Sequence, residues 1–107
     1  MAEVRNLGIK TGSVRRLGKE MVMYREEEQR EQAKVQKMKA NNADQYDLKH
    51  AENVLAESVA MVHDTHQRLK TAVKELEEFM EENTLLISQA PEFQAAKEEV
   101  EKATALL

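Results

Sequence analysis

The feature that most constrains this fold is an apolar stripe in the middle of the chain. Between residues 48 and 80 a stripe residue, apolar in every case but one histidine, recurs at every third or fourth position: Leu48, Ala51, Leu55, Val59, Val62, His66, Leu69, Val73, Leu76 and Met80. This spacing follows the period of an α-helix and places the stripe on one face. It predicts a helix over about residues 47–83, and residues 48–83 would span roughly 54 Å. A helix of that length needs an antiparallel partner.

The first third of the chain predicts that partner. The same spacing recurs at Val14, Leu17, Met21, Tyr24, Val35 and Met38. The hydroxyl residues of Thr11-Gly12-Ser13 resemble a helix start, because such a side chain accepts hydrogen bonds from the free N–H groups of a first turn. No proline or glycine interrupts residues 19–40. These signals predict a helix over about residues 13–40, although Glu28 and Glu31 fall within its stripe.

Two connections and a third helix follow. Residues 41–44 read Asn-Asn-Ala-Asp, which is typical of a turn, and Asp44 and Asp47 are both candidates to cap the following helix. Pro91 suits the first turn of a helix over about residues 91–107. The stripe of that helix is Phe93, Ala96, Val100, Ala103 and Leu107. For the linker 84–90 two alternatives stay open: its apolar residues extend the second helix, or they pack as a loop.

The fold class predicted is all-α, with residues 1–107 forming a single domain. It is an up-down-up three-helix bundle with long antiparallel first and second helices, coiled-coil-like packing and a shorter third helix. The composition agrees, because only 4% of residues are aromatic and the chain has three glycines and one proline. A β-sandwich or barrel needs more β-branched and aromatic residues and more turns.

The unequal helix lengths predict an uncovered region. A third helix of 17 residues spans only roughly 25 Å, so it covers the second helix from about 82 to 66 and the first from about 14 to 22. The remainder is a two-helix arm. There, Glu28 and Glu31 are expected to interrupt the stripe without burying charge. A thin, partly solvated seam is expected at Val35, Met38, Leu48, Leu55 and Val59.

Charge is unevenly distributed along the chain. Residues 1–40 hold ten Lys and Arg against six Asp and Glu, whereas residues 75–107 hold two against nine. A basic cluster, Lys10, Arg15, Arg16 and Lys19, lies near the start of the first helix. The net charge of −4 and the lack of a nucleic-acid motif argue against a nucleic-acid partner. An acidic protein surface is the more interesting partner, and a solvated helix face is the simpler explanation.

The sequence predicts neither an enzyme nor a metal protein. It has no cysteine, no G-x-S-x-G and no glycine-rich phosphate loop. His63 and His66 are three apart on one helix, but no third ligand accompanies them, so we predict a packed His66 and a solvent-facing His63. We also predict no cofactor. No apolar run reaches the roughly 18 residues of a membrane span, and the expectation is a soluble intracellular protein.

Two blocks of residues, in the same order along the chain, resemble the tubulin-folding cofactor A (tubulin-specific chaperone A) family. The first block comprises Ile9-Lys10-Thr11, Val14, Arg16-Leu17, Lys19-Glu20 and Val22-Met23-Tyr24. The second comprises Tyr46-Asp47-Leu48-Lys49, Glu52, Val54-Leu55, Glu57-Ser58 and Met61, with the internal spacing of that family. The resemblance covers about residues 9–70. One stretch departs, because His63 stands where the family commonly has a proline that would kink the helix.

The resemblance implies a cytoplasmic, cytoskeleton-associated chaperone without metal or nucleotide. Such a protein binds β-tubulin folding intermediates released from the chaperonin, on the route to the αβ-tubulin heterodimer, together with other tubulin-folding cofactors. Our hypothesis is that Arg15, Arg16 and Lys19 meet acidic surface on tubulin. Three residues of the second helix would orient the complex: Glu52, Glu57 and Arg68. The alternative is a coiled-coil scaffold or dimerisation module without tubulin specificity, and the chain is expected to be a monomer or a homodimer.

Overall fold

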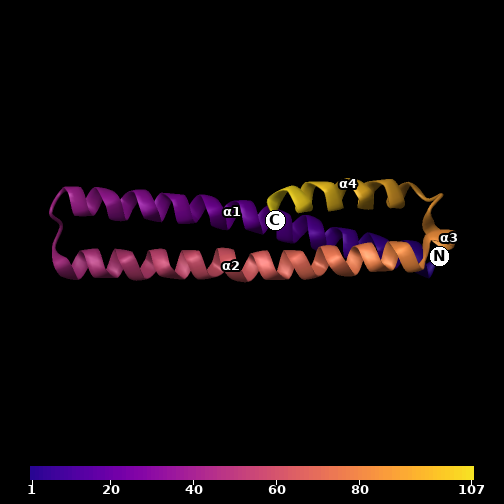
Figure 1. Cartoon of the computed structure of the whole chain (residues 1–107), viewed down its shortest axis with the longest axis horizontal. Helices are drawn as coiled ribbons and strands as arrows, with labels where there is room; N and C mark the ends of the chain where they lie inside the picture. The colour runs from indigo at the N-terminus through magenta and orange to yellow at the C-terminus, as the bar shows by residue number, and fades with distance from the viewer.

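The computed structural model describes residues 1–107 and contains four helices: α1 (Ala2–Ala40), α2 (Gln45–Glu82), α3 (Thr84–Ile87) and α4 (Pro91–Leu106). The long helices α1 and α2 run antiparallel, and α4 returns along the first half of α1 (Figure 1). The chain forms a rod of 63 × 16 × 16 Å. This arrangement confirms the predicted all-α, up-down-up architecture, in which the C-terminal helix α4 is shorter than α1 and α2.

The start of the first helix was predicted wrongly. Helix α1 begins at Ala2, not near residue 13. The Thr11 hydroxyl donates to the Leu7 carbonyl oxygen at 2.7 Å, and the Ser13 hydroxyl donates to the Ile9 carbonyl oxygen at 3.3 Å. Both side chains therefore bond back to the preceding turn and do not cap a new helix. Leu7, one heptad before Val14, is fully buried and extends the apolar stripe toward the N-terminus.

Two glycines in this first stretch give a test of its helicity. An added Cβ at Gly8 or Gly12 would have no neighbouring atom within 4 Å. We expect Gly8→Ala and Gly12→Ala each to raise the free energy of unfolding by about 0.5–1 kcal/mol, because alanine loses less backbone entropy in a helix. Urea unfolding followed by circular dichroism measures the change. A loss of stability in both variants would contradict a continuous α1.

The turn between the long helices is capped by Asp44. Its carboxylate accepts hydrogen bonds from the Tyr46 and Asp47 amides at 3.1 and 3.4 Å. Of the two candidate caps, Asp44 is therefore the cap, and Asp47 lies in the first turn of α2. Asn42 has a φ of 53°, in the left-handed region that asparagine tolerates better than most residues. The tight turn holds α1 and α2 side by side.

The linker after α2 matches neither sequence alternative fully. Helix α2 ends at Glu82, and the Asn83 side chain donates to the Phe79 carbonyl oxygen at 2.9 Å. The separate turn α3 follows, with Ile87 fully buried and Leu85 99% exposed. Pro91 occupies the first turn of α4, as predicted. The linker therefore adds one anchor, Ile87, to the core.

The core lies almost entirely where three helices meet. Its fully buried large side chains are Leu7, Val14, Met21, Leu69, Leu76 and Ile87. After Met21 on α1 and before Thr65 on α2, the only buried residues are Val35, Ala51 and Ser58. The Arg25 guanidinium donates to the Leu106 carbonyl oxygen at 2.6 Å, which fixes the end of α4. Beyond that contact α1 and α2 continue without a third helix (Figure 1).

Candidate protein-binding surfaces

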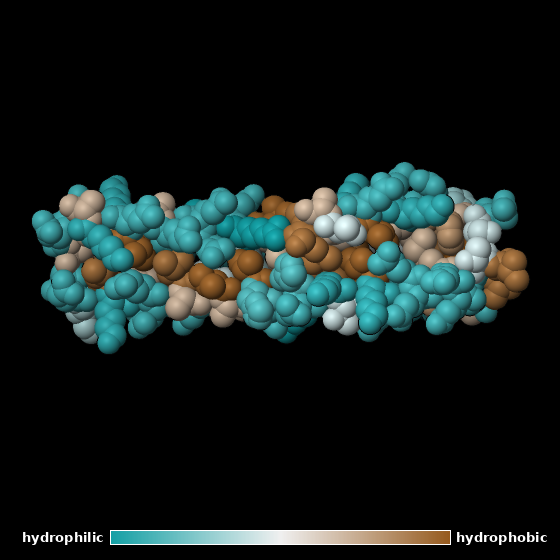
Figure 2. Space-filling view, in the orientation of Figure 1, coloured by the Kyte–Doolittle hydropathy of each residue, from teal (hydrophilic) through white to brown (hydrophobic).

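The two-helix region, residues 26–62, is called the arm below. Figure 2 shows hydrophobic residues in a nearly continuous band between its two helices, flanked by hydrophilic side chains. Val59 is 44% exposed, and Met38, Leu48 and Leu55 are half-buried. The predicted solvated seam is therefore present at these positions, whereas Val35 is buried. The arm presents apolar surface that the chain itself leaves uncovered.

The carboxylates in the arm differ from expectation. Glu28 and Glu31 are both half-buried, and the Oε2 atom of Glu31 is buried without a hydrogen-bond partner. The prediction that both residues avoid burying charge is therefore wrong for Glu31. A carboxylate oxygen without a partner costs free energy, and the arm has only three buried residues, Val35, Ala51 and Ser58, to supply buried apolar area in return. The arm is thus the least well-stabilised part of the rod.

The predicted basic residues do not form one patch. Arg15 and Lys19 line a groove between α1 and α4, which we call the α1–α4 groove. Arg16 lies on a different groove, between α1 and α2, together with Arg68. Residues 15 and 16 are adjacent in a helix and point about 100° apart, so they cannot share a face. The structure therefore places Arg15 with Lys19 in one groove and Arg16 with Arg68 in another.

Ion pairs further reduce the number of free charges. The Arg15 Nε atom donates to the Glu99 carboxylate at 3.0 Å, and the Arg68 guanidinium pairs with Asp64 at 3.1 Å. Glu52 and Glu57 are exposed on the arm, away from both grooves. The six predicted contact residues are therefore spread over three places on the rod.

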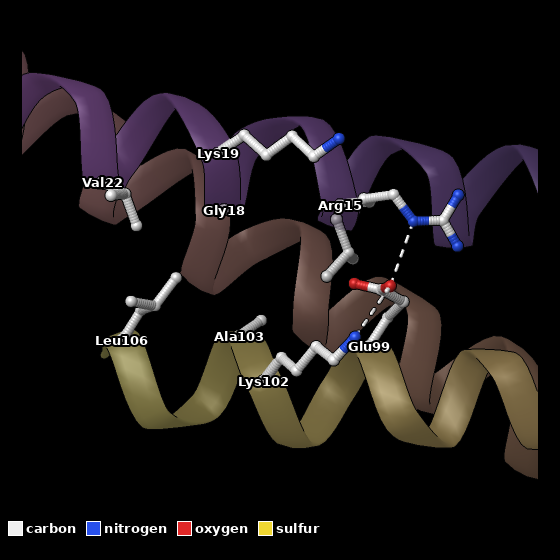
Figure 3. Close-up of a pocket in the computed structure, with 9 residues that line it drawn as sticks. Arg15, Gly18, Lys19, Val22, Glu99, Lys102, Ala103 and Leu106 are labelled. Carbon is white, nitrogen blue, oxygen red and sulfur yellow. Dashed lines mark hydrogen bonds and ion pairs between the residues drawn. The ribbon is translucent and has the colours of Figure 1, made fainter.

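The α1–α4 groove encloses about 490 Å³. Figure 3 shows Val22 and Leu106 facing each other across it, with Ala103 beside them and Gly18 on the α1 wall. Lys102 lies on the rim, its Nζ atom 3.9 Å from the Glu99 carboxylate. Sequence reasoning missed Lys102, because its place beside Arg15 depends on the register of α4 against α1.

The histidines lie as the sequence predicts. His66 is half-buried, with its Nε2 atom 3.3 Å from the Leu107 carbonyl oxygen, whereas His63 is exposed. No group of three or more His, Cys, Asp or Glu side chains is placed to hold a metal ion. Every helix is too short or too polar to cross a membrane.

The chain is similar to known proteins along most of its length. A model of the family described as Tubulin binding cofactor A matches residues 2–100. The chain belongs to this family. The tubulin-folding cofactor A of Arabidopsis thaliana is 44% identical over 101 residues, which are 94% of this chain and 89% of that protein. The tubulin-specific chaperone A of Homo sapiens is 38% identical over 94 residues, covering 88% of this chain and 86% of that protein.

Solved structures of tubulin binding cofactor A relatives share the fold. The crystal structure of the Arabidopsis thaliana tubulin folding cofactor A superposes with a TM-score of 0.90 at 42% identity, covering 98% of both chains. The human tubulin chaperone cofactor A gives a TM-score of 0.84 at 36% identity, covering 95% of this chain and 98% of that one. The resemblance seen over residues 9–70 therefore extends to nearly the whole rod.

Membership of the tubulin binding cofactor A family also settles the class of function. The family consists of non-enzymatic chaperones, and this chain is a homologue of tubulin-specific chaperone A. Its exposed surfaces are accordingly interpreted as binding surfaces for another protein and not as parts of a catalytic site.

Proposed function

We propose that this chain binds tubulin, and specifically that it captures β-tubulin folding intermediates released from the chaperonin. It then keeps them competent for assembly into the αβ-tubulin heterodimer, in the cytoplasm, in association with the cytoskeleton and together with other tubulin-folding cofactors. The relatives named tubulin-folding cofactor A and tubulin-specific chaperone A support this proposal, since they match along most of this chain.

The observation that carries the proposal is the uncovered apolar band of the arm. A folding intermediate has apolar surface that is not yet buried, and it aggregates through that surface. The arm offers a complementary hydrophobic band flanked by hydrophilic side chains (Figure 2), and Val59 in the arm is 44% exposed. Because α4 ends near Arg25 and His66, no part of this chain competes for the band.

Charged residues are proposed to orient the client on the rod. Arg16 and Arg68 line one groove, and Arg15 and Lys19 line another, so acidic client surface would contact both sides of α1. Glu52 and Glu57, exposed on the arm, would exclude clients that present acidic surface there. These contacts supply orientation and speed of association more than affinity, because exposed ion pairs are weak.

Co-purification with soluble β-tubulin, in the absence and presence of α-tubulin, tests the proposal. Val59→Glu is expected to weaken capture about tenfold or more, because it removes a valine side chain worth about 1.5–3 kcal/mol when buried and adds a charge. Leu85→Glu is the matched control, because Leu85 is exposed in α3, at the end of the rod away from the arm (Figure 1). Equal loss in both variants, or no capture by the wild-type chain, would contradict the proposal.

The alternative is a scaffold that dimerises through the arm. The same apolar band favours it, because two arms packed against each other would bury the exposed Val59 of each chain. Light scattering distinguishes the two functions. A stable dimer that does not bind β-tubulin would support the scaffold, whereas a monomer that binds β-tubulin would exclude it.

A further inference from the structure

The α1–α4 groove combines an apolar interior with a basic rim. Val14, Val22 and Leu106 form apolar walls, and Lys19 and Lys102 are exposed cations at its edge. This is unusual for the last third of the chain, because residues 75–107 carry two Lys and Arg against nine Asp and Glu. One of those two cations therefore lies at this groove, which makes the groove a basic position in an otherwise acidic region.

The charges on the rim are not all neutralised within the chain. The Glu99 carboxylate lies 3.0 Å from Arg15 and 3.9 Å from Lys102, and Figure 3 shows it between the two cations. Lys19 has no carboxylate partner within 4.0 Å, and its side chain extends along α1 at the outer side of the groove (Figure 3). Three cations and one carboxylate thus surround the hollow, which leaves an excess of positive charge for an acidic ligand.

Gly18 keeps the hollow open. An added Cβ at this position would lie 3.6 Å from Leu106 Cδ1, which is an ordinary van der Waals contact. Glycine is therefore not required here by a close approach of two helices, and alanine would be the better helix former. The absence of a side chain at Gly18 leaves space between Val22 and Leu106 that the core does not fill (Figure 3).

From this arrangement we infer that the α1–α4 groove binds an acidic segment of the client that carries a bulky apolar side chain. The apolar side chain enters the hollow over Gly18, and the flanking carboxylates pair with Lys19 and Lys102. The inference rests on the proposed function in one respect, because it takes the tubulin client as the source of the segment. The groove would be a second binding site in addition to the arm, and it lies outside the arm, between α1 and α4.

Short synthetic peptides test the ligand chemistry without the client. The first has a phenylalanine between two pairs of glutamates, the second replaces the phenylalanine with glycine, and the third replaces the glutamates with lysines. We expect the first peptide to shift the backbone NMR signals of Gly18, Val22 and Ala103. The glycine peptide is expected to bind about tenfold more weakly, because it lacks the buried aromatic side chain, and the lysine peptide is expected not to bind.

Variants of the groove connect the peptide to the site. Gly18→Leu places a side chain in the hollow and is expected to weaken binding of the phenylalanine peptide about tenfold or more. Gly8→Leu is its matched control, because an added Cβ at Gly8 meets no atom within 4 Å. The double variant Lys19→Glu, Lys102→Glu leaves the hollow unchanged and is expected to abolish binding at low salt. If leucine at position 18 displaces α4, this double variant still tests whether the peptide binds in the groove.

The outcomes separate this inference from the proposed function. If the wild-type chain captures β-tubulin but the peptide shifts signals elsewhere, or binds both groove variants unchanged, the inference is overturned and the function stands. If the peptide binds in the groove but β-tubulin is not captured, the groove is supported and the proposed function is overturned. Capture of β-tubulin that is weakened by the double lysine variant, with peptide shifts confined to the groove, supports both.

Discussion

Replacing Ile87 with alanine is expected to lower the free energy of unfolding by about 2–5 kcal/mol. Ile87 is fully buried in the short turn α3, where it joins the cluster that holds α1, α2 and α4 together. Removing its side chain leaves a cavity at the junction, and the turn has no other buried residue to compensate. For a domain of this size, such a loss is a large part of the total stability.

Leu85 is the matched control for Ile87. It lies in the same turn, two residues earlier, and is 99% exposed. Leu85→Ala is therefore expected to change the free energy of unfolding by less than about 0.5 kcal/mol. Urea unfolding of both variants, followed by circular dichroism, gives the comparison. Equal effects would mean that α3 does not anchor α4 to the core in the way described.

The apolar spacing was sufficient to predict the long helices, their antiparallel pairing and the uncovered arm. In the structure the Lys10 Nζ atom lies 5.5 Å from the centre of the Phe79 ring, so the beginning of α1 lies beside the end of α2. The apolar spacing was not sufficient for the first residues of α1. There, Gly8, Thr11 and Gly12 weaken the local helix signal, and the helix forms because Leu7 is buried against the far end of the bundle.

The sequence proposes candidate contact residues but does not show how they group on the surface. Helix geometry alone shows that Arg15 and Arg16 point in different directions. Which groove each of them faces depends on where α4 packs, and the same packing places Lys102 near Arg15. The buried Oε2 atom of Glu31 depends on side-chain conformations in the arm, which residue spacing does not specify.

The second large effect is expected from His63→Pro. Helix α2 runs without interruption through His63, whose side chain is exposed. Proline there removes the amide that donates to the Val59 carbonyl oxygen, and its ring collides with the same carbonyl, so we expect a cost of about 3 kcal/mol. His63→Ala is the matched control and is expected to leave stability unchanged or slightly raised, because alanine is a better helix former.

The consequence of this change for the arm follows from its weak seam. Near His63 the arm is held by Ser58 and the half-buried Leu55 and Val62, so little apolar packing opposes a bend. Proline is therefore expected to kink α2 within the turn between Val59 and His63 and to reorient the exposed band that we propose binds β-tubulin. Small-angle X-ray scattering measures the bend and co-purification measures capture. An unbent rod with unchanged stability would show that the seam holds α2 straight without that hydrogen bond. A bent rod with unchanged capture would show that β-tubulin binding does not depend on the shape of the arm.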